Sequence, residues 1–246
     1  MNVLPGVHIV GSGSLGLSIT HRDDSHVYLV ASEDDAVLID AGCGGDTDGI
    51  VARIRGTGID PAAVSRILLT HAHPDHAAGA NDLARALHAE VFADPEVADI
   101  LRRADADAAG LTTARAAGLY PPPVELRPTS VTDLADRTTL DVGRIRIQAV
   151  ATPGHAMGHL CFLAELDGCT ALFSGDLVFA RGRVAVLGTP DTHVALLADS
   201  VRRVRGLAPD ALLPGHGTVV LRHAIEHLDV AIECFDHGAL PPPLLP

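Results

Sequence analysis

The stretch His71-Ala72-His73-Pro74-Asp75-His76 places four potential metal ligands within six residues. It follows the apolar run Ile67-Leu68-Leu69 and one threonine. A strand that ends there delivers the ligands to a loop at its carboxyl end, where α/β folds commonly hold their sites. Imidazole and carboxylate suit zinc, and also iron or manganese. His71 and His73 can chelate one ion, while Asp75 and His76 project elsewhere and can hold a second.

Three segments downstream each place one His or Asp beside glycine at the end of an apolar run. They are Thr152-Pro153-Gly154-His155, Ser174-Gly175-Asp176 and Pro214-Gly215-His216-Gly217. Glycine lets the backbone turn sharply and approach a site closely. The resulting set of five His and two Asp matches two metals that share one carboxylate and leave room for water. A structural zinc site would instead be closed, four-coordinate and usually rich in Cys.

The four motifs, in this order, resemble the metallo-β-lactamase superfamily over most of the chain, from about residue 7 to residue 216. The resemblance implies an α/β fold, a four-layer αβ/βα sandwich with the metals at one edge. It also implies a role for each ligand: His71, His73 and His155 bind the first metal, Asp75, His76 and His216 bind the second, and Asp176 bridges them. The competing interpretation, solvated loop histidines, must explain why five of the 14 histidines lie in matching contexts.

Length and composition indicate one α/β domain over residues 1–246. The net charge of −13 disfavours nucleic acid, which needs clustered basic residues. We find no signal peptide and no apolar segment near the ~20 residues of a membrane span, so we expect a cytoplasmic protein without a membrane partner. The four cysteines lie far apart without a CxxC pair, which indicates reduced thiols.

Apolar runs and turn signals predict the order of the elements. Strands are expected at 7–10, 26–31, 36–39, 67–69, 91–93, 145–150, 159–166, 170–174 and 211–213. Helices are expected at 50–56, 77–87, 193–204 and 222–235, with a helical turn at Asp60-Pro61. The helix at 77–87 begins just after the ligands, so its positive end is expected to face the site.

Two segments stand outside this alternation. Residues about 95–125 have helical spacing, and the resemblance implies that they form a helical cap that shapes the substrate pocket; the alternative is a plain surface hairpin of helices. Residues 240–246 are predicted to be a loose tail.

The segment Gly11-Ser12-Gly13-Ser14-Leu15-Gly16 matches the dinucleotide pattern GxGxxG. That pattern requires a following helix within a βαβ unit. Residues 18–24 are instead polar and lead into a predicted strand. We therefore interpret the segment as a loop beside a hairpin, which could border the site.

Two cations and a water suggest hydrolysis of an acyl ester, thioester or lactone, a small-molecule substrate, by a metal-bridging hydroxide. Asp176 would hold both metals, and Asp75 could also move a proton. Asp40, at a strand end, either orients a ligand imidazole or is a turn acid. His159 either points into the pocket or braces it. The favoured cofactor is a pair of zinc ions, with iron or manganese as alternatives.

Within the superfamily, this chain is most similar to glyoxalase II-like thioesterases, with which it shares the motifs THAHPDH, TPGH and FSGD. Those enzymes carry a glutathione-binding helical region, whereas only 30 residues follow His216 here. Their Gly-Cys-Gly-Arg stretch is replaced by Ala180-Arg181-Gly182-Arg183. Arg181 or Arg183 could still pair with a substrate carboxylate. Lactone hydrolases of the superfamily use a tyrosine near the metals. The two tyrosines here are Tyr28, expected in the core, and Tyr120, at the end of the cap, so the lactonase marker is missing, and Tyr120 is retained only as a candidate contact to substrate.

An alternative class is oxygen chemistry. Persulfide dioxygenases resemble this fold and bind one iron, for which His71, His155 and Asp176 would be the ligands. The complete second set of ligands argues against that function. Nucleases of the superfamily add domains or a long arm, which this acidic chain lacks. Oligomer frequencies alone favour a homodimer.

Overall fold

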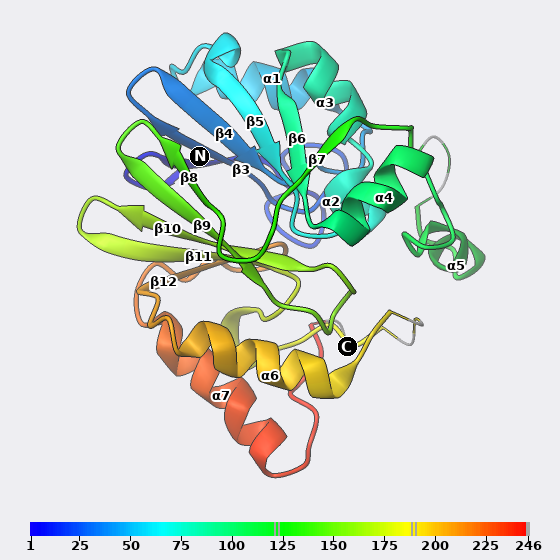
Figure 1. Cartoon of the computed structure of the whole chain (residues 1–246), viewed down its shortest axis with the longest axis vertical. Coiled ribbons are helices and arrows are strands. Elements are labelled where there is room, and N and C mark those ends of the chain that lie inside the picture. Colours follow the sequence, from blue (N-terminus) through cyan, green and yellow to red (C-terminus); the bar gives the residue numbers. More distant parts are fainter. Residues whose placement is uncertain (121, 123, 188, 190, 245–246) are drawn as a thin grey trace.

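A computed structural model describes residues 1–120, 122, 124–187, 189 and 191–244 of the chain (Figure 1). Its strands form two sheets. The first sheet contains, in spatial order, β1 (Asn2–Leu4), β2 (Val7–Gly11), β3 (Val27–Ser32), β4 (Asp35–Ile39), β5 (Val64–Leu68), β6 (Glu90–Ala93) and β7 (Val131–Asp133). The second contains β12 (Ala211–Pro214), β11 (Cys169–Gly175), β10 (Leu160–Leu166), β9 (Ile145–Ala151) and β8 (Thr139–Val142).

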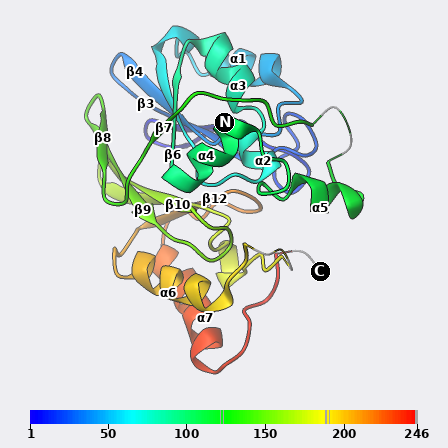
Figure 2. The ribbon, with the colours of Figure 1, turned by 45° about the vertical axis from the view of Figure 1, so that its right-hand side comes forward.

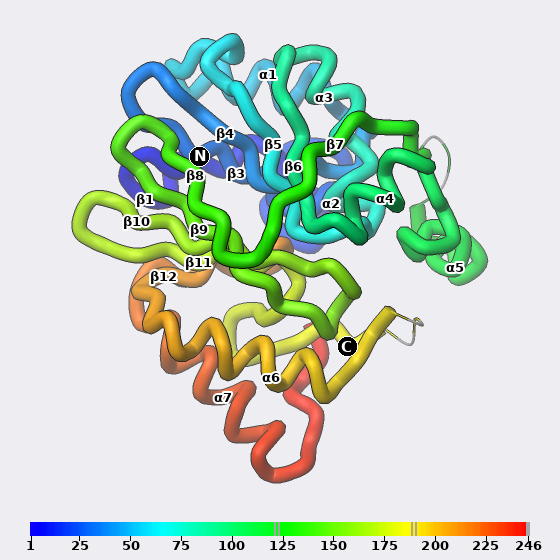
Figure 3. The backbone as a smooth tube through the Cα atoms, viewed as in Figure 1, coloured from blue at the N-terminus to red at the C-terminus, as the bar shows by residue number. Residues whose placement is uncertain are grey.

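Helices lie outside the two sheets, and most of them cover an outer face. They are α1 (Thr47–Gly56), α2 (Pro74–Ala77), α3 (Ala80–Leu87), α4 (Pro95–Arg103), α5 (Leu111–Ala116), α6 (Val194–Arg205) and α7 (Ala224–Asp236), with short 3-10 helices η1 (Pro61–Ala63) and η2 (Ala180–Gly182). In Figure 3 the blue-to-green half of the chain forms the first sheet and its helices, and the green-to-red half forms the second. The predicted four-layer αβ/βα sandwich is confirmed.

Strand β4 shows why the first sheet lies in the middle of a sandwich. Ala36 and Leu38 pack with the helices on one face, while Val37 and Ile39 pack against the second sheet. Side chains alternate between the faces of a strand, so a strand buried on both faces has a continuous apolar sequence. The run 36–39 is such a sequence, and its strand is confirmed.

The two sheets pack through interleaved aliphatic and aromatic side chains. Phe162 of β10 and Phe173 of β11 are both fully buried there. Tyr28 of β3 meets Phe173 edge-on, with ring centroids 5.1 Å apart, and its hydroxyl donates to the carbonyl of Pro214 at 2.7 Å. That hydrogen bond satisfies the one polar atom that Tyr28 takes into the core.

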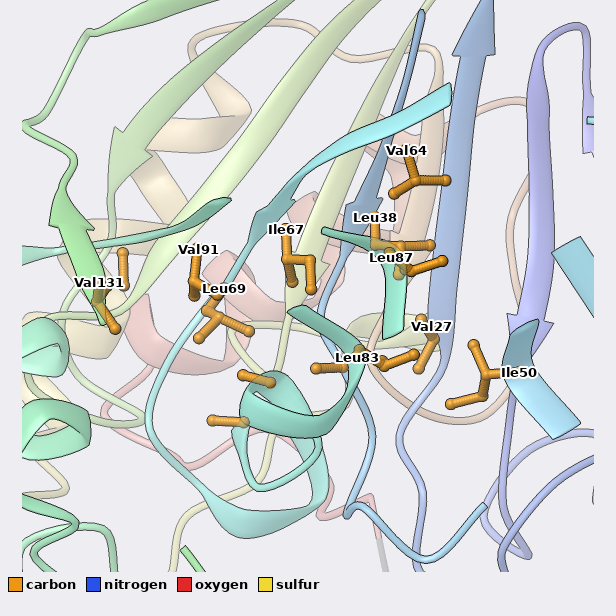
Figure 4. Close-up of a cluster of buried hydrophobic side chains, with 14 of the residues drawn as sticks. Val27, Leu38, Ile50, Val64, Ile67, Leu69, Leu83, Leu87, Val91 and Val131 are labelled. Carbon is orange, nitrogen blue, oxygen red and sulfur yellow. The ribbon is translucent and has the colours of Figure 1, made fainter. Parts of the chain in front are cut away.

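Aliphatic side chains fill the layer between the first sheet and its helices (Figure 4). Ile50 of α1 and Leu83 and Leu87 of α3 pack there against Leu38 and Ile67 of the strands. On the other side, α6 and α7 cover the second sheet through Leu197, Val201 and Leu228. With few aromatic residues in the chain, both outer cores depend on Leu, Ile and Val.

The single helix predicted at 77–87 is wrong. Asp75 and His76 lie inside the four-residue helix α2, and α3 begins only after Gly79. The backbone of Gly79 packs so closely on the turn after β4 that a Cβ there would lie 2.2 Å from the carbonyl oxygen of Ala41. Asp75 and His76 therefore lie within a short helix of their own rather than ahead of a longer one.

The predicted loose tail is also wrong for its described residues. The N–H of Val184 donates to the carbonyl of Pro242 at 3.1 Å, and the N–H of Leu244 donates to the carbonyl of Val184 at 2.9 Å. These two bonds pin the segment beside η2. Residues 245 and 246 of the predicted tail lie outside the described residues.

The predicted cap segment contains two helices. Helix α4 packs on β7 and β6, whereas α5 stands away from both sheets (Figure 2). A Cβ at Gly110, just before α5, would lie 3.6 Å from the His73 ring. The segment therefore approaches the ligands, and its role as a cap stays a prediction. Residues 121 and 123 within it lie outside the described residues.

None of the helices in the described part of the chain is both long enough and apolar enough to span a bilayer.

Candidate metal centre

All seven predicted ligands lie buried together at one edge of the two sheets. His71 and His73 follow β5, and Asp75 and His76 lie in α2, which begins with Pro74 at its first position, where proline is favoured. The other three ligands follow strands of the second sheet: His155 after β9, Asp176 after β11 and His216 after β12. Because β11 and β12 are parallel, their carboxyl ends bring Asp176 and His216 to the same edge.

The first group of ligands is formed by three imidazoles. The Nδ1 atom of His73 lies 3.0 Å from the Nε2 atoms of both His71 and His155. Burial lowers the pKa of His155 to about 4 and, together with the neighbouring imidazoles, holds the pKa of His71 well below its ordinary value. Both rings are therefore neutral near pH 7, the state that binds a metal.

The second group combines a carboxylate with two imidazoles. Oδ2 of Asp75 lies 3.0 Å from Nε2 of His216 and 3.7 Å from Nε2 of His76. Burial alone would raise the pKa of Asp75, but His76 and His216 lower it to about 2. Asp75 is therefore ionised at neutral pH.

Asp176 lies between the two groups. Its Oδ1 is 3.3 Å from Nε2 of His76, and its Oδ2 is 3.7 Å from Nε2 of His155 and 3.6 Å from Nε2 of His216. Burial disfavours its charge, but the imidazoles outweigh burial and hold its pKa well below the ordinary value. One ionised carboxylate thus reaches ligands of both groups.

These donors fit divalent cations. Nε2 of His76 and Oδ1 of Asp176 are buried and make no hydrogen bond. A buried polar atom without a partner is costly, so these two atoms indicate a binding partner of another kind. Gly215 allows the close approach, since a Cβ there would lie 2.4 Å from Oδ1 of Asp176. In three sets of these residues, one donor atom from each member lies within 4.8 Å of the others. The sets are His71–His73–His155, His71–His76–Asp176 and Asp75–His76–His216.

Asp40 lies behind the second group, as one of the two interpretations of the sequence predicted. Its Oδ2 accepts from Nδ1 of His76 at 2.8 Å, and its Oδ1 accepts from the N–H of Thr70 at 2.8 Å. The Asp40 backbone is left-handed, with φ +63°. That conformation turns the carboxylate under the ligand loop, where it fixes the His76 ring with Nε2 toward the centre.

We expect Asp40→Asn to weaken metal binding about 10-fold, because a neutral amide holds the His76 ring less firmly than a carboxylate. Metal titration of the apoprotein, followed by competition with a chromophoric chelator, measures the effect. Asp48→Asn on the exposed start of α1 removes the same charge away from the site and is the control. Equal affinities for both variants would contradict the role of Asp40.

His159 braces the site and does not point into a pocket. It is buried, its Nδ1 lies 2.9 Å from the hydroxyl of Thr152, and its Nε2 accepts from the N–H of Asp176 at 3.3 Å. Both ring nitrogens are therefore occupied by protein groups. Of the two interpretations of His159, these contacts support the brace, a positioning role for the Asp176 loop.

Two contacts to the first group escaped the sequence analysis. Oδ2 of Asp191 lies 3.3 Å from Nε2 of His73, and Nδ1 of His155 lies 2.8 Å from the carbonyl of Ala185. Both partners belong to the segment between η2 and α6. Burial alone would raise the pKa of Asp191, but His73 and Thr189 lower it to about 2. Neither partner has a sequence signal, because one is a backbone carbonyl and the other a single loop acid.

The predicted substrate residues divide into two groups. The hydroxyl of Tyr120 lies beside Asp75; burial and then that carboxylate raise its pKa well above the ordinary value, so it stays protonated. Arg181 and Arg183 have exposed side chains. The backbone N–H of Arg181 donates to His227 of α7, and the guanidinium of Arg183 donates to the carbonyl of Leu244. The structure brings Tyr120 to the cluster but gives neither arginine a contact with it, and substrate binding by all three stays a prediction.

Gly11 ends β2, the rest of the glycine-rich segment, residues 12–16, is a loop as predicted, and no helix follows it in the described residues 17–26. The carbonyl of Leu15 accepts from the N–H of Gly217 at 2.7 Å, directly after the ligand His216. The loop therefore borders the site.

A family model described as the metallo-β-lactamase superfamily matches residues 21–216. The chain belongs to the metallo-β-lactamase superfamily. Its fold is shared with solved structures, including a Cronobacter sakazakii metallo-β-lactamase with a TM-score of 0.69, 23% identity and coverage of 88% of this chain and 80% of that chain. A second, described as a B3 metallo-β-lactamase with an active-site glutamic acid, has a TM-score of 0.70 and 23% identity, and covers 94% of this chain and 86% of that one.

Among curated relatives, thioesterase pkgB of Emericella nidulans is 30% identical over 197 residues, 80% of this chain and 47% of that protein. Protein YobT of Bacillus subtilis is 29% identical over 219 residues, 84% of this chain and 88% of that protein. The atrochrysone carboxyl ACP thioesterase of Aspergillus fumigatus is 28% identical over 198 residues, 80% of this chain and 38% of that protein. The chain spans about half or less of the length of these two thioesterases. The fold is that of the superfamily, and the site brings together donors suited to divalent metals.

Proposed function

We propose that this chain is a dinuclear metal-dependent hydrolase of acyl esters, with thioesters as the favoured substrates and lactones as the related alternative. The observation that carries the proposal is the position of Asp176, whose two oxygens face ligands of both groups. A single-metal site would need only one of these groups. The favoured metal is zinc, because the ligands are imidazole nitrogens and carboxylate oxygens.

Each residue then has a defined part. His71, His73 and His155 would hold one metal, and Asp75, His76 and His216 the other, with Asp176 shared between them. Such a metal pair supplies a nucleophile from water at neutral pH and polarises the acyl carbonyl. Asp75 is ionised, so its carboxylate can accept a proton beside the leaving group. Tyr120 stays protonated next to Asp75 and can donate a hydrogen bond to a bound acyl substrate.

The names of two relatives support a thioester substrate, since both are called thioesterases. A third relative, from Bacillus velezensis, is described as a probable polyketide biosynthesis zinc-dependent hydrolase and is 24% identical over 196 residues. We extend that chemistry to this chain as part of the proposal. The proposal also includes a small-molecule acyl substrate and no nucleic-acid or membrane partner. It places the protein in the cytoplasm, as a homodimer.

The dioxygenase alternative is not favoured. It would use His71, His155 and Asp176 to bind one iron, and the remaining candidate ligands would then bind no metal. Asp75, His76 and His216 are nevertheless buried and converge within 4.8 Å, and Asp40 orients His76 among them. Burying a second set of donors without a function would be costly.

The test combines metal analysis with a substrate panel. We expect about two metal equivalents per chain at this centre of His and Asp ligands, and hydrolysis of acyl thioesters that a chelator abolishes and added zinc restores. The panel includes lactones and β-lactams as the competing substrates. One equivalent of iron with oxygen uptake, or turnover that survives complete metal removal, would refute the proposal.

A further inference from the structure

A second set of metal-type donors lies outside the seven ligands. The Sγ atom of Cys43, after β4, lies 3.1 Å from Nδ1 of His21, in the loop between β2 and β3. Oδ1 of Asp24 accepts from the N–H of Cys43 at 2.8 Å, and donor atoms of Cys43, His21 and Asp24 lie within 4.8 Å of one another. Cys43 and Asp24 are buried, and the His21 side chain is 27% exposed. Thiol, imidazole and carboxylate thus converge from two loops.

Asp23 adds an observation of a different kind. Its Oδ2 is buried without a hydrogen-bond partner and lies 3.8 Å from Nδ1 of His21. Its Oδ1 lies 3.5 Å from Nε of Arg22, whose side chain is 77% exposed. A buried carboxylate oxygen without a donor requires an explanation, and a cation beside the His21 ring provides one.

The backbone around these donors leaves room only for glycine. A Cβ at Gly45 would lie 2.5 Å from the His21 ring, and a Cβ at Gly42 would lie 2.7 Å from Oδ1 of Asp24. Gly42 also has φ +68°. His21 and Asp24, in the loop between β2 and β3, therefore pack directly against the turn after β4. Cys43 lies in that turn, between Gly42 and Gly45.

We propose that Cys43, His21 and Asp24, completed by Asp23, form a third metal site that binds zinc. Thiolate with imidazole is a donor pair typical of zinc, and carboxylate is its third common ligand. Both Asp24 oxygens already accept one hydrogen bond, from Cys43 and from Thr20, and each keeps a further lone pair. On binding, the ion replaces the thiol proton that Cys43 shares with His21, and that proton is released to solvent.

The site would tie two loops that support the catalytic ligands. Next to Asp24, the N–H of Ser25 donates to the carbonyl of Asp75 at 3.0 Å. Two residues before Cys43, the N–H of Ala41 donates to the carbonyl of His76 at 2.8 Å. A metal that joins the loops therefore fixes the backbone of α2, which carries Asp75 and His76. Its role is structural, and its donor set contains a sulfur atom that the seven catalytic ligands lack.

The difference in donors gives a direct test with cobalt(II) as the probe. We expect the cobalt-loaded protein to show a thiolate-to-cobalt charge-transfer absorption, which imidazole and carboxylate ligands do not produce. Cys43→Ser should abolish that absorption and lower bound cobalt by about one equivalent per chain. Cys234→Ser, at a half-buried cysteine of α7, is the matched control and should keep both.

His21→Ala provides a second variant at a partly exposed residue and should weaken the same absorption if Cys43→Ser folds poorly. Asp176→Asn should leave the charge-transfer absorption intact while it disturbs the catalytic cobalt, which separates this site from the proposed hydrolase centre. A wild-type protein without the absorption, or a Cys43→Ser protein with unchanged absorption and cobalt content, would overturn the proposal and leave a thiol hydrogen-bonded to His21.

Discussion

Asp176→Asn should lower kcat/KM for acyl-thioester hydrolysis at least ~10³-fold, a loss of about 4 kcal/mol of transition-state stabilisation. The amide has almost the same shape as the carboxylate but carries no charge. It therefore leaves the positive charge of two adjacent cations uncompensated. We expect the metal bound at the centre of the seven candidate ligands to fall below two equivalents, while circular dichroism and the unfolding transition keep their wild-type form. Steady-state kinetics and metal analysis on the same preparation measure both effects.

Asp199→Asn is the control for this variant. Asp199 lies exposed on α6, where Arg202 is its one ion-pair partner among the described residues, so the substitution changes the net charge equally at a distance from the site. It should keep wild-type turnover. Turnover by Asp176→Asn within a few-fold of the wild type would contradict the assignment of Asp176 as the shared ligand.

Gly154→Ala should destabilise the protein by about 3 kcal/mol and lower activity about 10²-fold. A Cβ at Gly154 would lie 2.2 Å from the backbone nitrogen of Leu197 in α6, and φ is +138°, a conformation that side chains disfavour. Either the loop or α6 must move. His155 is the next residue, so its Nε2 should move away from its place 3.0 Å from Nδ1 of His73. Urea unfolding and metal titration measure the two consequences.

Gly168→Ala is the control that separates the effect of a positive φ from the effect of the contact with α6. Gly168 also has a positive φ, +81°, in the turn between β10 and β11, but nothing lies within 4 Å of its Cβ position. It should cost about 1 kcal/mol and leave the metal affinity unchanged. If Gly154→Ala binds metal as tightly as Gly168→Ala, contact with α6 does not position His155.

Local sequence was enough to identify the strands that carry the site. The run 36–39 and the runs before His71, Asp176 and His216 are apolar and end in a turn, which is a short-range pattern. His71, Asp176 and His216 lie one to three residues beyond such strands, so these strands determine that the three side chains reach the carboxyl ends. The seven candidate ligands were therefore available from motifs, and the superfamily resemblance implied their grouping.

Tertiary contacts decided what motifs do not encode. The choice between brace and pocket for His159 depended on Thr152 and the Asp176 loop, which lie on other elements. The pairing of Asp191 with His73 joins residues 118 apart in the sequence.

The same holds for the ends of elements and for the second donor set. Helix 77–87 divided because Gly79 packs on Ala41, and residues 242–244 were ordered by Val184. Cys43 and His21 gave no motif because their donors come from separate loops. Periodicity reports the burial of a strand or helix along its own length, whereas hydrogen bonds and donor clusters form between segments that only the folded chain brings together.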